Sequence, residues 1–322
     1  MNEHGTDRPA AYQGRGWKPR VGTLAADVEA GELWRRAGVR AEWHELKDVL
    51  LFIPDAETPS PEEVNDVQHL ETIRFPLLNA QMEEVASAYE RLGVRVHRIV
   101  PVSAGPFYNL FFARDLLFMT PEGAVVSRMA SQVRAGEERH AAHALADLGV
   151  PILRTISGGG TFEGADALWA RKDLVLVGVG NRTNREGFVQ LEACLAPMGV
   201  RCEAVALPAG VQHLLGCVQI VDEDRAVVRG RILPEESRAL LEGLGFALLS
   251  LGESPEVTRR QAMNFVVLGP RRIAMVAGCP ETAEIYSAAG IEVALELKVG
   301  ELLKGAGGPA CATAIIGREP PP

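Results

Sequence analysis

A glycine that closes a helix-like segment and is followed at once by an apolar, strand-like run recurs five times in this chain. These glycines are Gly93, Gly149, Gly199, Gly245 and Gly290, at successive steps of 56, 50, 46 and 45 residues. Glycine adopts most readily the left-handed backbone conformation that ends a helix, and apolar alternation is typical of a strand. The chain is therefore expected to consist of repeats of similar length.

Two apolar runs joined by a tight turn lie between successive glycines, and a helical stretch follows them. The turns fall at 121–123, 171–173, 222–224 and 269–271, where Gly, Pro and Asp favour hairpins. The unit is therefore strand, strand, helix, strand. Four copies are complete, and the fifth is divided between HELKDVLLFIP with FPLLNAQMEEVASAYERLG near the front and CATAIIG at the back.

A chain whose first and last segments complete one unit must close into a ring. Such units cannot bury their apolar faces alone, so they share one core. The sequence therefore predicts an α/β fold, a five-bladed pseudo-symmetric αβ propeller around a central cavity. We expect one catalytic domain over residues 21–322, preceded by a polar, disordered tail over residues 1–20.

The composition excludes several classes of protein. Hydrophobic residues make up 47% of the 322 residues, which supports a sizeable core. The formal charge of −9 and the absence of a long basic run argue against a nucleic acid partner. No apolar stretch reaches membrane-spanning length, and five scattered cysteines without CxxC spacing fit a reduced, cytoplasmic protein.

One conspicuous polar residue marks the first strand of each predicted unit. These residues are Asp115, Glu163, His213, Asn264 and Cys311, at steps of 48, 50, 51 and 47 residues. Equivalent positions in a ring of units face a common axis. The sequence thus brings two acids, an imidazole, an amide and a thiol to one central cavity, with Asn264 expected to satisfy the backbone rather than to act in catalysis.

This set of side chains suits the chemistry of a guanidinium group. Two carboxylates, Asp115 and Glu163, only accept hydrogen bonds when ionised, so they fit a planar cation with several N–H donors. The central carbon of that cation is an electrophile that the thiolate of Cys311 can attack. His213 is the natural general acid and base, first for the leaving amine and then for the water that cleaves an amidino-cysteine.

Several motifs, in the same order, resemble a known superfamily. GTFEGAD followed by GVGNRTNREG resembles the dimethylarginine dimethylaminohydrolases. A second set of motifs resembles the arginine deiminases, namely NLFFARDLLF, VSRMASQVRAGEE, QHLLGCVQIVD and GGPACAT. From about Leu46 to Ile316 the chain is similar to the guanidino-group-modifying (pentein) superfamily, whose fold is a five-bladed propeller.

The resemblance implies roles for residues of this chain. It implies Cys311 as nucleophile, His213 as acid and base, and Glu163 as the partner of His213 and of the substrate guanidinium. Further candidate substrate-binding residues follow from the same motifs. They are Asp115 for the guanidinium, Arg134 and Arg182 for a substrate carboxylate, and Asp166 (as a helper or a structural residue), Asn109, Phe112 and Leu215.

Three positions depart from the family pattern. Leu215 stands where arginine deiminases have an Asp that grips the guanidinium, and Ala310 stands where they have an Arg. Ala165 replaces a usual Gly, which we interpret as a packing variation. An apolar Leu215 would leave one guanidino nitrogen without a partner and could tolerate an N-methyl group or another substituent.

The sequence leaves alternatives open. Cys311 and His213 could also be buried core residues without a catalytic role. Their equivalent positions in the repeat argue against that interpretation. A nucleotide site is disfavoured because GVGNRTNREG lacks the GK[ST] of a phosphate loop. A metal site is disfavoured because carboxylates mixed with one thiolate are an unusual zinc set.

The leading hypothesis is a hydrolase of arginine or N-substituted arginine that needs no cofactor or metal. An amidinotransferase, which passes the same amidino group to an amine, is the first alternative, and a non-catalytic ligand-binding propeller is the second. We expect a small guanidino compound as partner and neither nucleic acid nor membrane, and the exposed outer helices would allow a homodimer. The segment 54–71 is the candidate lid.

Overall fold

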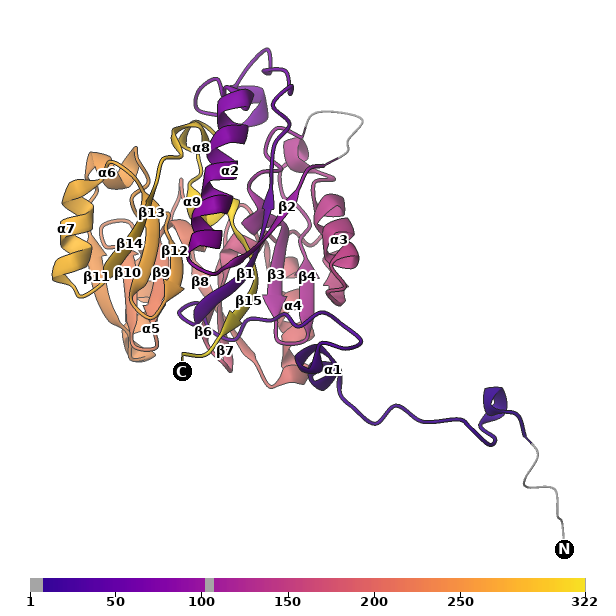
Figure 1. Cartoon of the computed structure of the whole chain (residues 1–322). Coiled ribbons are helices and arrows are strands. Elements are labelled where there is room, and N and C mark those ends of the chain that lie inside the picture. The colour runs from indigo at the N-terminus through magenta and orange to yellow at the C-terminus, as the bar shows by residue number, and fades with distance from the viewer. Residues whose placement is uncertain (1–7, 102–106, 322) are drawn as a thin grey trace, which may run out of the picture.

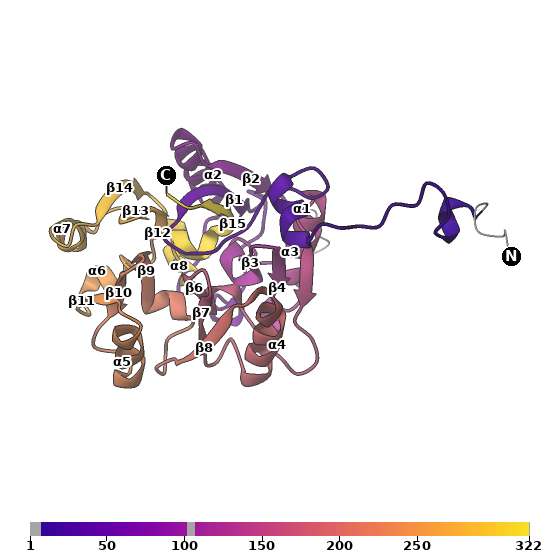
Figure 2. The same cartoon turned by 90° about the horizontal axis from the view of Figure 1, so that it is seen from below.

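The computed structural model describes residues 8–101 and 107–321, and in them five three-stranded sheets follow one another around a common centre (Figure 2). In each sheet the middle strand is antiparallel to the first strand of the unit and parallel to the last. The five sheets are β15 (Ala314–Glu319), β1 (Glu45–Phe52), β2 (Arg95–Ile99); β3 (Leu117–Thr120), β4 (Gly123–Val126), β5 (Ile152–Thr155); β6 (Ala167–Arg171), β7 (Leu174–Val179), β8 (Arg201–Ala206); β9 (Val218–Asp222), β10 (Arg225–Arg229), β11 (Ala247–Leu251); and β12 (Val266–Gly269), β13 (Arg272–Val276), β14 (Glu292–Leu297).

One helix precedes the last strand of each unit and lies on the outside of the ring (Figures 1 and 2). These helices are α2 (Phe75–Arg91), α3 (Glu138–Asp147), α4 (Arg185–Leu195), α5 (Glu235–Gly243) and α7 (Pro280–Ala288). The described chain also contains shorter α-helices, namely α1 (Leu24–Ala30), α6 (Pro255–Thr258), α8 (Gly300–Lys304) and α9 (Pro309–Ala312).

The predicted repeat is confirmed in both its order and its closure. Each predicted hairpin turn joins the first two strands of a sheet. The last strand of the chain, β15, pairs antiparallel with β1, and β1 pairs parallel with β2. The fifth unit is therefore assembled from the two ends of the chain, as the sequence predicted for a closed ring.

The five glycines that mark the repeat have positive φ angles, between 72° and 88°. An added Cβ at Gly93, Gly199 or Gly290 would meet no atom within 4 Å. Glycine is therefore required there by the left-handed backbone and not by crowding. The backbone geometry explains why this one residue type is the clearest sign of the repeat.

The core lies between the sheets and the helices that cover them. The first strands of the units are buried along almost their whole length. The outer helices bury one stripe each, and α2 packs Leu78, Met82, Val85 and Tyr89 inward at the spacing of a helical face. Trp169 and Tyr286 are the other largest fully buried side chains.

The described chain has no buried side chain from residue 8 to residue 27, and Figure 1 shows the part before α1 leading away from the ring. Residues 1–7 lie outside the described residues, so a tail over residues 1–20 stays a prediction, and so does the boundary at residue 21. No helix among the described residues is long and apolar enough to cross a membrane.

Candidate active site

The five polar residues of the repeat lie in the short segments that lead into the first strands, and Cys311 is part of α9. Asp115 precedes β3, Glu163 precedes β6, His213 precedes β9, Asn264 precedes β12 and Cys311 precedes β15. The expectation that they lie on the strands themselves was wrong. Because the first strands are buried almost throughout, they have no face that opens to a cavity, and the segment before each strand carries the polar side chain instead.

The backbone that leads to Cys311 requires its glycines. An added Cβ at Gly307 would lie 2.2 Å from Cε1 of Phe112, and one at Gly308 would lie 2.9 Å from Cγ of Asn264. A Cβ atom essentially never lies this close to an atom to which it is not bonded, so a larger residue at either position would displace those side chains. The glycine-rich run therefore lets Phe112 and Asn264 pack directly against the chain that presents the thiol.

Asn264 holds both the backbone and the side chain of Cys311. Its Oδ1 accepts hydrogen bonds from the backbone N–H of Ala310 at 2.8 Å and of Cys311 at 3.3 Å. Its Nδ2 donates to Sγ of Cys311 at 2.9 Å. The sequence led us to expect only the backbone contacts, and the hydrogen bond to sulfur was missed because no local signal indicates it.

Burial and the carboxylate of Asp115 raise the pKa of the Cys311 thiol to about 11, although the hydrogen bond from Asn264 acts in the opposite direction. The thiol is therefore protonated near neutral pH in the absence of a ligand. A cation placed beside Asp115 would neutralise one cause of the raised pKa. The resting site thus has its nucleophile in the unreactive form, and a bound cation favours the reactive thiolate.

His213 is held between two carboxylates. Its Nε2 lies 2.7 Å from Oε2 of Glu163, and its Nδ1 lies 3.8 Å from Oδ1 of Asp115. Burial alone would lower the pKa of His213, but the charges of Asp115 and Glu163 outweigh it and raise the pKa to about 9. The imidazole is therefore protonated at neutral pH and can give a proton away.

Glu163 is fully buried and ionised. Burial would raise its pKa, but the hydrogen bond with His213 and the charges of His213, Arg134 and Arg182 lower it to about 2. Its Oε1 also accepts from the backbone N–H of Ala130 at 3.1 Å and lies 3.5 Å from Nη1 of Arg182. Glu163 therefore fixes His213 in place and keeps it charged.

Asp115 has one oxygen in use and one oxygen free among the described residues. Its Oδ2 accepts from Nη1 of Arg134. Its Oδ1 has no hydrogen-bond partner there, and the residue is only 2% exposed. Because a buried carboxylate oxygen without a donor is unfavourable, this atom is where a ligand N–H group would be stabilised most.

Arg134 has a different environment from the one expected for a residue that binds a substrate carboxylate. Its guanidinium donates to Asp115, to Glu137 at 2.9 Å and, over longer distances, to the carbonyl oxygens of Asn109 and Phe112. The side chain is 5% exposed. Its donors are thus directed at protein acceptors, and the geometry makes it a support for Asp115. Arg182 is more accessible. Its side chain is 14% exposed and lines the same small pocket as Asp115 and Cys311.

Two connected hollows meet at the thiol. A narrow recess of about 20 Å³ is lined by most of the predicted residues, and a cavity of about 220 Å³ adjoins it. Four residues line both hollows: Gln212, His213, Ala306 and Cys311. The recess alone is lined by the charged groups Asp115, Arg134 and Arg182.

Leu215 lines the larger cavity and not the recess. Among the described residues no carboxylate lines this cavity, and its one arginine, Arg229, is already paired with Glu253. Its other walls include Val211, Val257 and Met263. The larger cavity therefore suits an uncharged group, whereas the recess suits a cation.

Asp166 lines neither hollow, and its contacts are those of a structural residue. It is fully buried, accepts from the hydroxyl of Thr183 at 2.6 Å and accepts from the backbone N–H of Leu214 at 2.9 Å. Burial raises its pKa to about 7. Since Leu214 follows His213 directly, Asp166 holds the turn that presents the imidazole, which is the structural alternative the sequence left open.

Asn109 and Phe112 line the recess, and their part in binding a ligand stays a prediction. The amide of Asn109 donates to the carbonyl of Val67 at 2.8 Å, so it also ties the candidate lid segment to the site. That segment contributes Gln68 to the recess. Gln68 and Gln212 are cleft residues that the sequence analysis missed, because a glutamine in a loop carries no distinctive pattern.

Donor atoms of Asp115, Glu163 and His213 lie within 4.8 Å of one another, close enough to hold a metal ion. The positive guanidinium of Arg134 contacts Asp115 and lies 4.0 Å from Glu163. A divalent cation placed among these carboxylates would be repelled by it, whereas one planar monovalent cation could use the free oxygen of Asp115. The donor set therefore favours an organic cation.

The fold and this cluster define a class of proteins that act on guanidino groups, and comparison with known proteins agrees. A family model described as arginine deiminase matches residues 81–242, half of the chain. The chain therefore belongs to the arginine deiminase family, within the guanidino-group-modifying (pentein) superfamily.

Its curated relatives differ in their described activities. A dimethylarginine dimethylaminohydrolase of Streptomyces coelicolor is 29% identical over 60% of this chain and 69% of its own length. An arginine deiminase of Mycobacterium marinum is 26% identical over 72% of this chain and 66% of its own length. An uncharacterised protein of Aeropyrum pernix is 26% identical over 73% of this chain and 84% of its own length.

Solved structures share the fold at lower identity. A dimethylarginine dimethylaminohydrolase of Pseudomonas aeruginosa aligns with a TM-score of 0.68 at 21% identity, over 84% of this chain and 99% of its own. An inosamine-phosphate amidinotransferase of Streptomyces griseus aligns with a TM-score of 0.71 at 14% identity, over 88% and 97%. These matches confirm the predicted five-unit propeller.

Proposed function

We propose that this protein hydrolyses a C–N bond of N-substituted arginine or a related guanidino compound, giving a ureido product such as citrulline and an amine. The observation that carries the proposal is the arrangement around Asp115. A free, buried carboxylate oxygen lies 3.8 Å from a protonated imidazole, in a recess that Cys311 also lines. A cation-binding group, an acid and a nucleophile thus share one small space.

The substrate guanidinium would donate to Oδ1 of Asp115. Its positive charge would offset the carboxylate that raises the pKa of Cys311, so the thiol would lose its proton to solvent when the substrate is bound. The hydrogen bond from Asn264 then stabilises the thiolate. This order keeps the free protein protected from unspecific reaction, since its thiol has a pKa of about 11.

Sγ of Cys311 then attacks the central guanidino carbon and forms a C–S bond. His213 gives its proton to the nitrogen of the leaving amine, and the C–N bond breaks. Neutral His213 next takes a proton from water as the oxygen attacks the amidino carbon, and the C–S bond breaks to release the ureido product. The balance is one water consumed and one amine released, with the thiolate and the imidazolium restored.

The larger cavity supports an N-substituted substrate. Leu215 lines it in place of a group that would bind a free amino nitrogen, and no carboxylate among the described residues reaches it. An uncharged substituent on the leaving nitrogen would fit there while the cationic centre stays in the recess. The α-carboxylate of the substrate would be bound by Arg182, which is more accessible than Arg134.

The test is intact-protein mass spectrometry after incubation with a panel of guanidino compounds at mildly acidic pH, with Cys311→Ser as the control. A small adduct on the wild type alone is the expected result, because acid slows the water step. The substrate that gives the adduct is then assayed for citrulline. The N-substituted preference fails if unsubstituted arginine is turned over at least as well as every N-substituted analogue.

An amidinotransferase is the second candidate, favoured by the same cavity of about 220 Å³ beside Cys311 and His213. An acceptor amine held there would take the place of water at the amidino carbon. Product analysis with and without ornithine, glycine or lysine separates the two reactions, because transfer gives a new guanidine and hydrolysis gives a ureido product.

A further inference from the structure

A second cavity, of about 320 Å³, lies away from the thiol and shares no lining residue with the two hollows of the candidate active site. Its walls come from α1, the segment 36–44, the start of β1, the end of β15 and the β3–β4 turn. Strand β15 begins three residues after Cys311 and runs for six residues to this cavity, a span of about 20 Å. Figure 1 shows the C-terminus at the far end of β15 from α9.

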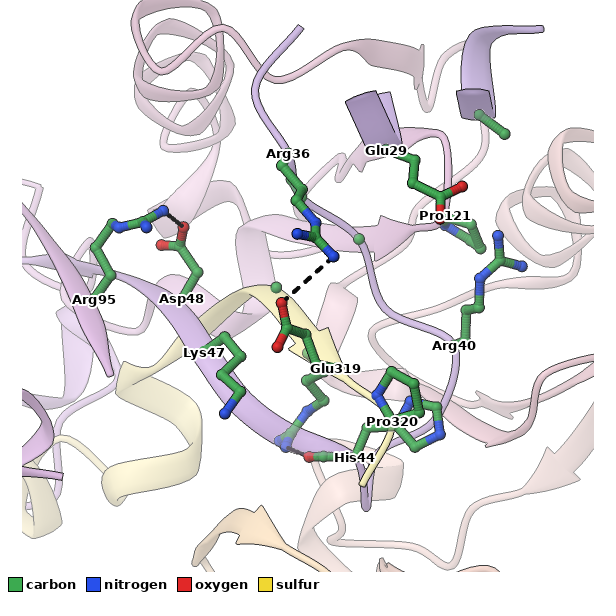
Figure 3. A pocket seen from close by; sticks show the side chains of 15 residues that line it. Glu29, Arg36, Arg40, His44, Lys47, Asp48, Arg95, Pro121, Glu319 and Pro320 are labelled. Atoms are coloured by element: carbon green, nitrogen blue, oxygen red, sulfur yellow. Dashed lines mark hydrogen bonds and ion pairs between the residues drawn. The ribbon is translucent and has the colours of Figure 1, made fainter. Parts of the chain in front are cut away.

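Positive charge predominates in this cavity. Five cationic side chains line it, against three carboxylates. Two of those carboxylates already have partners, since Asp48 binds Arg95 at 3.2 Å and Glu319 lies 3.7 Å from Arg36. Figure 3 shows Arg36 facing Glu319, with Lys47 and Arg40 on either side of that pair. Arg40 and Lys47 have no carboxylate within 4.0 Å among the described residues.

The decisive residue is Arg318, which lines the cavity and is only 8% exposed. Its Nη1 donates to the carbonyl oxygens of His44 and Val267 at 2.7 and 2.8 Å. Its Nε has no hydrogen-bond partner among the described residues, and no carboxylate there lies within ion-pair distance of its guanidinium. Buried charges in folded proteins are normally paired, so this arginine favours an anionic ligand from outside the chain.

The titration behaviour of the same groups agrees with an excess of positive charge. Burial lowers the pKa of Arg318 to about 10. Burial and the charges of Arg318 and Arg40 also lower the pKa of His44. The charges of Glu42 and Glu45 act on Arg318 in the opposite direction, but Glu42 is already bound to Arg114 at 2.9 Å and Glu45 lies 3.9 Å from Arg272. The unsatisfied positive charge is therefore available at the cavity.

We propose that this cavity binds a small metabolite that carries at least two carboxylate or phosphate groups. One anionic group would pair with the buried Arg318, and a second would reach Lys47 and Arg40 at the outer wall. The volume of about 320 Å³ exceeds what a single inorganic ion fills and lies at the lower end of the range for small-molecule pockets. The site is independent of the proposed reaction.

Isothermal titration calorimetry of the full chain tests the proposal, with citrate and pyrophosphate as probes and inorganic phosphate as the single-group comparison. At least one two-group probe is expected to bind once per chain, about tenfold or more tighter than phosphate. The double variant Arg40→Glu, Lys47→Glu should weaken that binding by at least about tenfold, which is 1.4 kcal/mol. Both residues are exposed, so the variant should fold.

Lys172→Glu is the matched control, since Lys172 is an exposed residue in the β6–β7 turn and does not line this cavity; it should bind like the wild type. Arg182→Gln is measured in parallel because Arg182 faces the active-site recess. Three results overturn the proposal: neither probe binds, the double variant binds as tightly as the control, or binding is lost in Arg182→Gln instead. Citrate and pyrophosphate compared with each other distinguish a carboxylate ligand from a phosphate ligand.

Discussion

Replacing Asn264 with Asp is the sharpest test of how the thiol is controlled. The aspartate keeps the Oδ1 acceptor that holds the N–H groups of Ala310 and Cys311. It removes the Nδ2 donor that lies 2.9 Å from Sγ of Cys311 and puts a carboxylate oxygen there. The substitution therefore changes the electrostatics of the sulfur while the backbone contacts of the site remain.

The size of the effect follows from the lost hydrogen bond. A hydrogen bond to a charged group contributes about 1.5 to 3 kcal/mol, which corresponds to a rise of roughly one to two pKa units. The wild-type thiol already has a pKa of about 11, so near neutral pH the thiolate fraction should fall about tenfold to hundredfold. A thiolate with a higher pKa is also more nucleophilic. On a logarithmic scale, this gain offsets about half of the loss in alkylation rate that the smaller thiolate fraction causes. We therefore expect Cys311 to be alkylated at least about threefold more slowly in Asn264→Asp. Repulsion between the new carboxylate and the thiolate should slow the reaction further.

The assay is the rate of alkylation of Cys311 by iodoacetamide, followed by peptide mass spectrometry. Cys194 is the other partly exposed cysteine, so it serves as an internal reference in the same sample. Gln212→Glu is the control, because Gln212 lines the same cavity and this variant adds the same charge without replacing the hydrogen-bond donor to the sulfur. An unchanged Cys311 to Cys194 ratio in a folded Asn264→Asp variant would refute the reasoning.

Three further predictions concern the same site. Because His213 must be protonated to act as the acid and its pKa is raised to about 9, kcat at saturating substrate, where the thiol has already lost its proton, should fall as pH rises through about 9; a kcat that falls well below that pH contradicts the assignment. Leu215→Asp should move the ratio of kcat/KM for arginine over N-substituted arginine upward by about tenfold, the effect of one good interaction; an unchanged ratio in a folded variant argues against Leu215 as a specificity residue. Gly307→Ala should lower the free energy of unfolding by about 1–3 kcal/mol because its Cβ would meet Phe112. Urea denaturation measures this, and Phe112→Leu in the same background should recover part of the loss unless the clash is elsewhere.

The fold was largely predictable because its signals are local. A left-handed glycine after a helix, a hairpin turn and an alternating apolar run each depend on a few neighbouring residues, and the ring closes because the end segments complete one unit. The same periodicity placed Asp115, Glu163, His213, Asn264 and Cys311 together. The periodicity placed these residues on the first strands, whereas they lie just before them, because the spacing could not show that the first strands are buried on both faces.

The roles of individual side chains were less predictable. Arg134 and Asp166 looked like ligand-binding residues, but the structure directs Arg134 at Asp115 and Glu137, and directs Asp166 at Thr183 and the backbone of Leu214. Such choices depend on which donors and acceptors meet after the units pack. A motif shows that a charged residue is present and leaves its hydrogen-bond partners open.

The sequence by itself determined the repeat, its closure and the set of residues at the centre, because φ preferences and hydrophobic spacing act within each unit. The tertiary structure alone decided that Asp115 keeps one oxygen free, that Asn264 contacts the sulfur of Cys311 and that Arg318 lines a second, positively charged cavity. Each of these contacts joins residues from different parts of the chain. Their geometry exists only once the five units share one core.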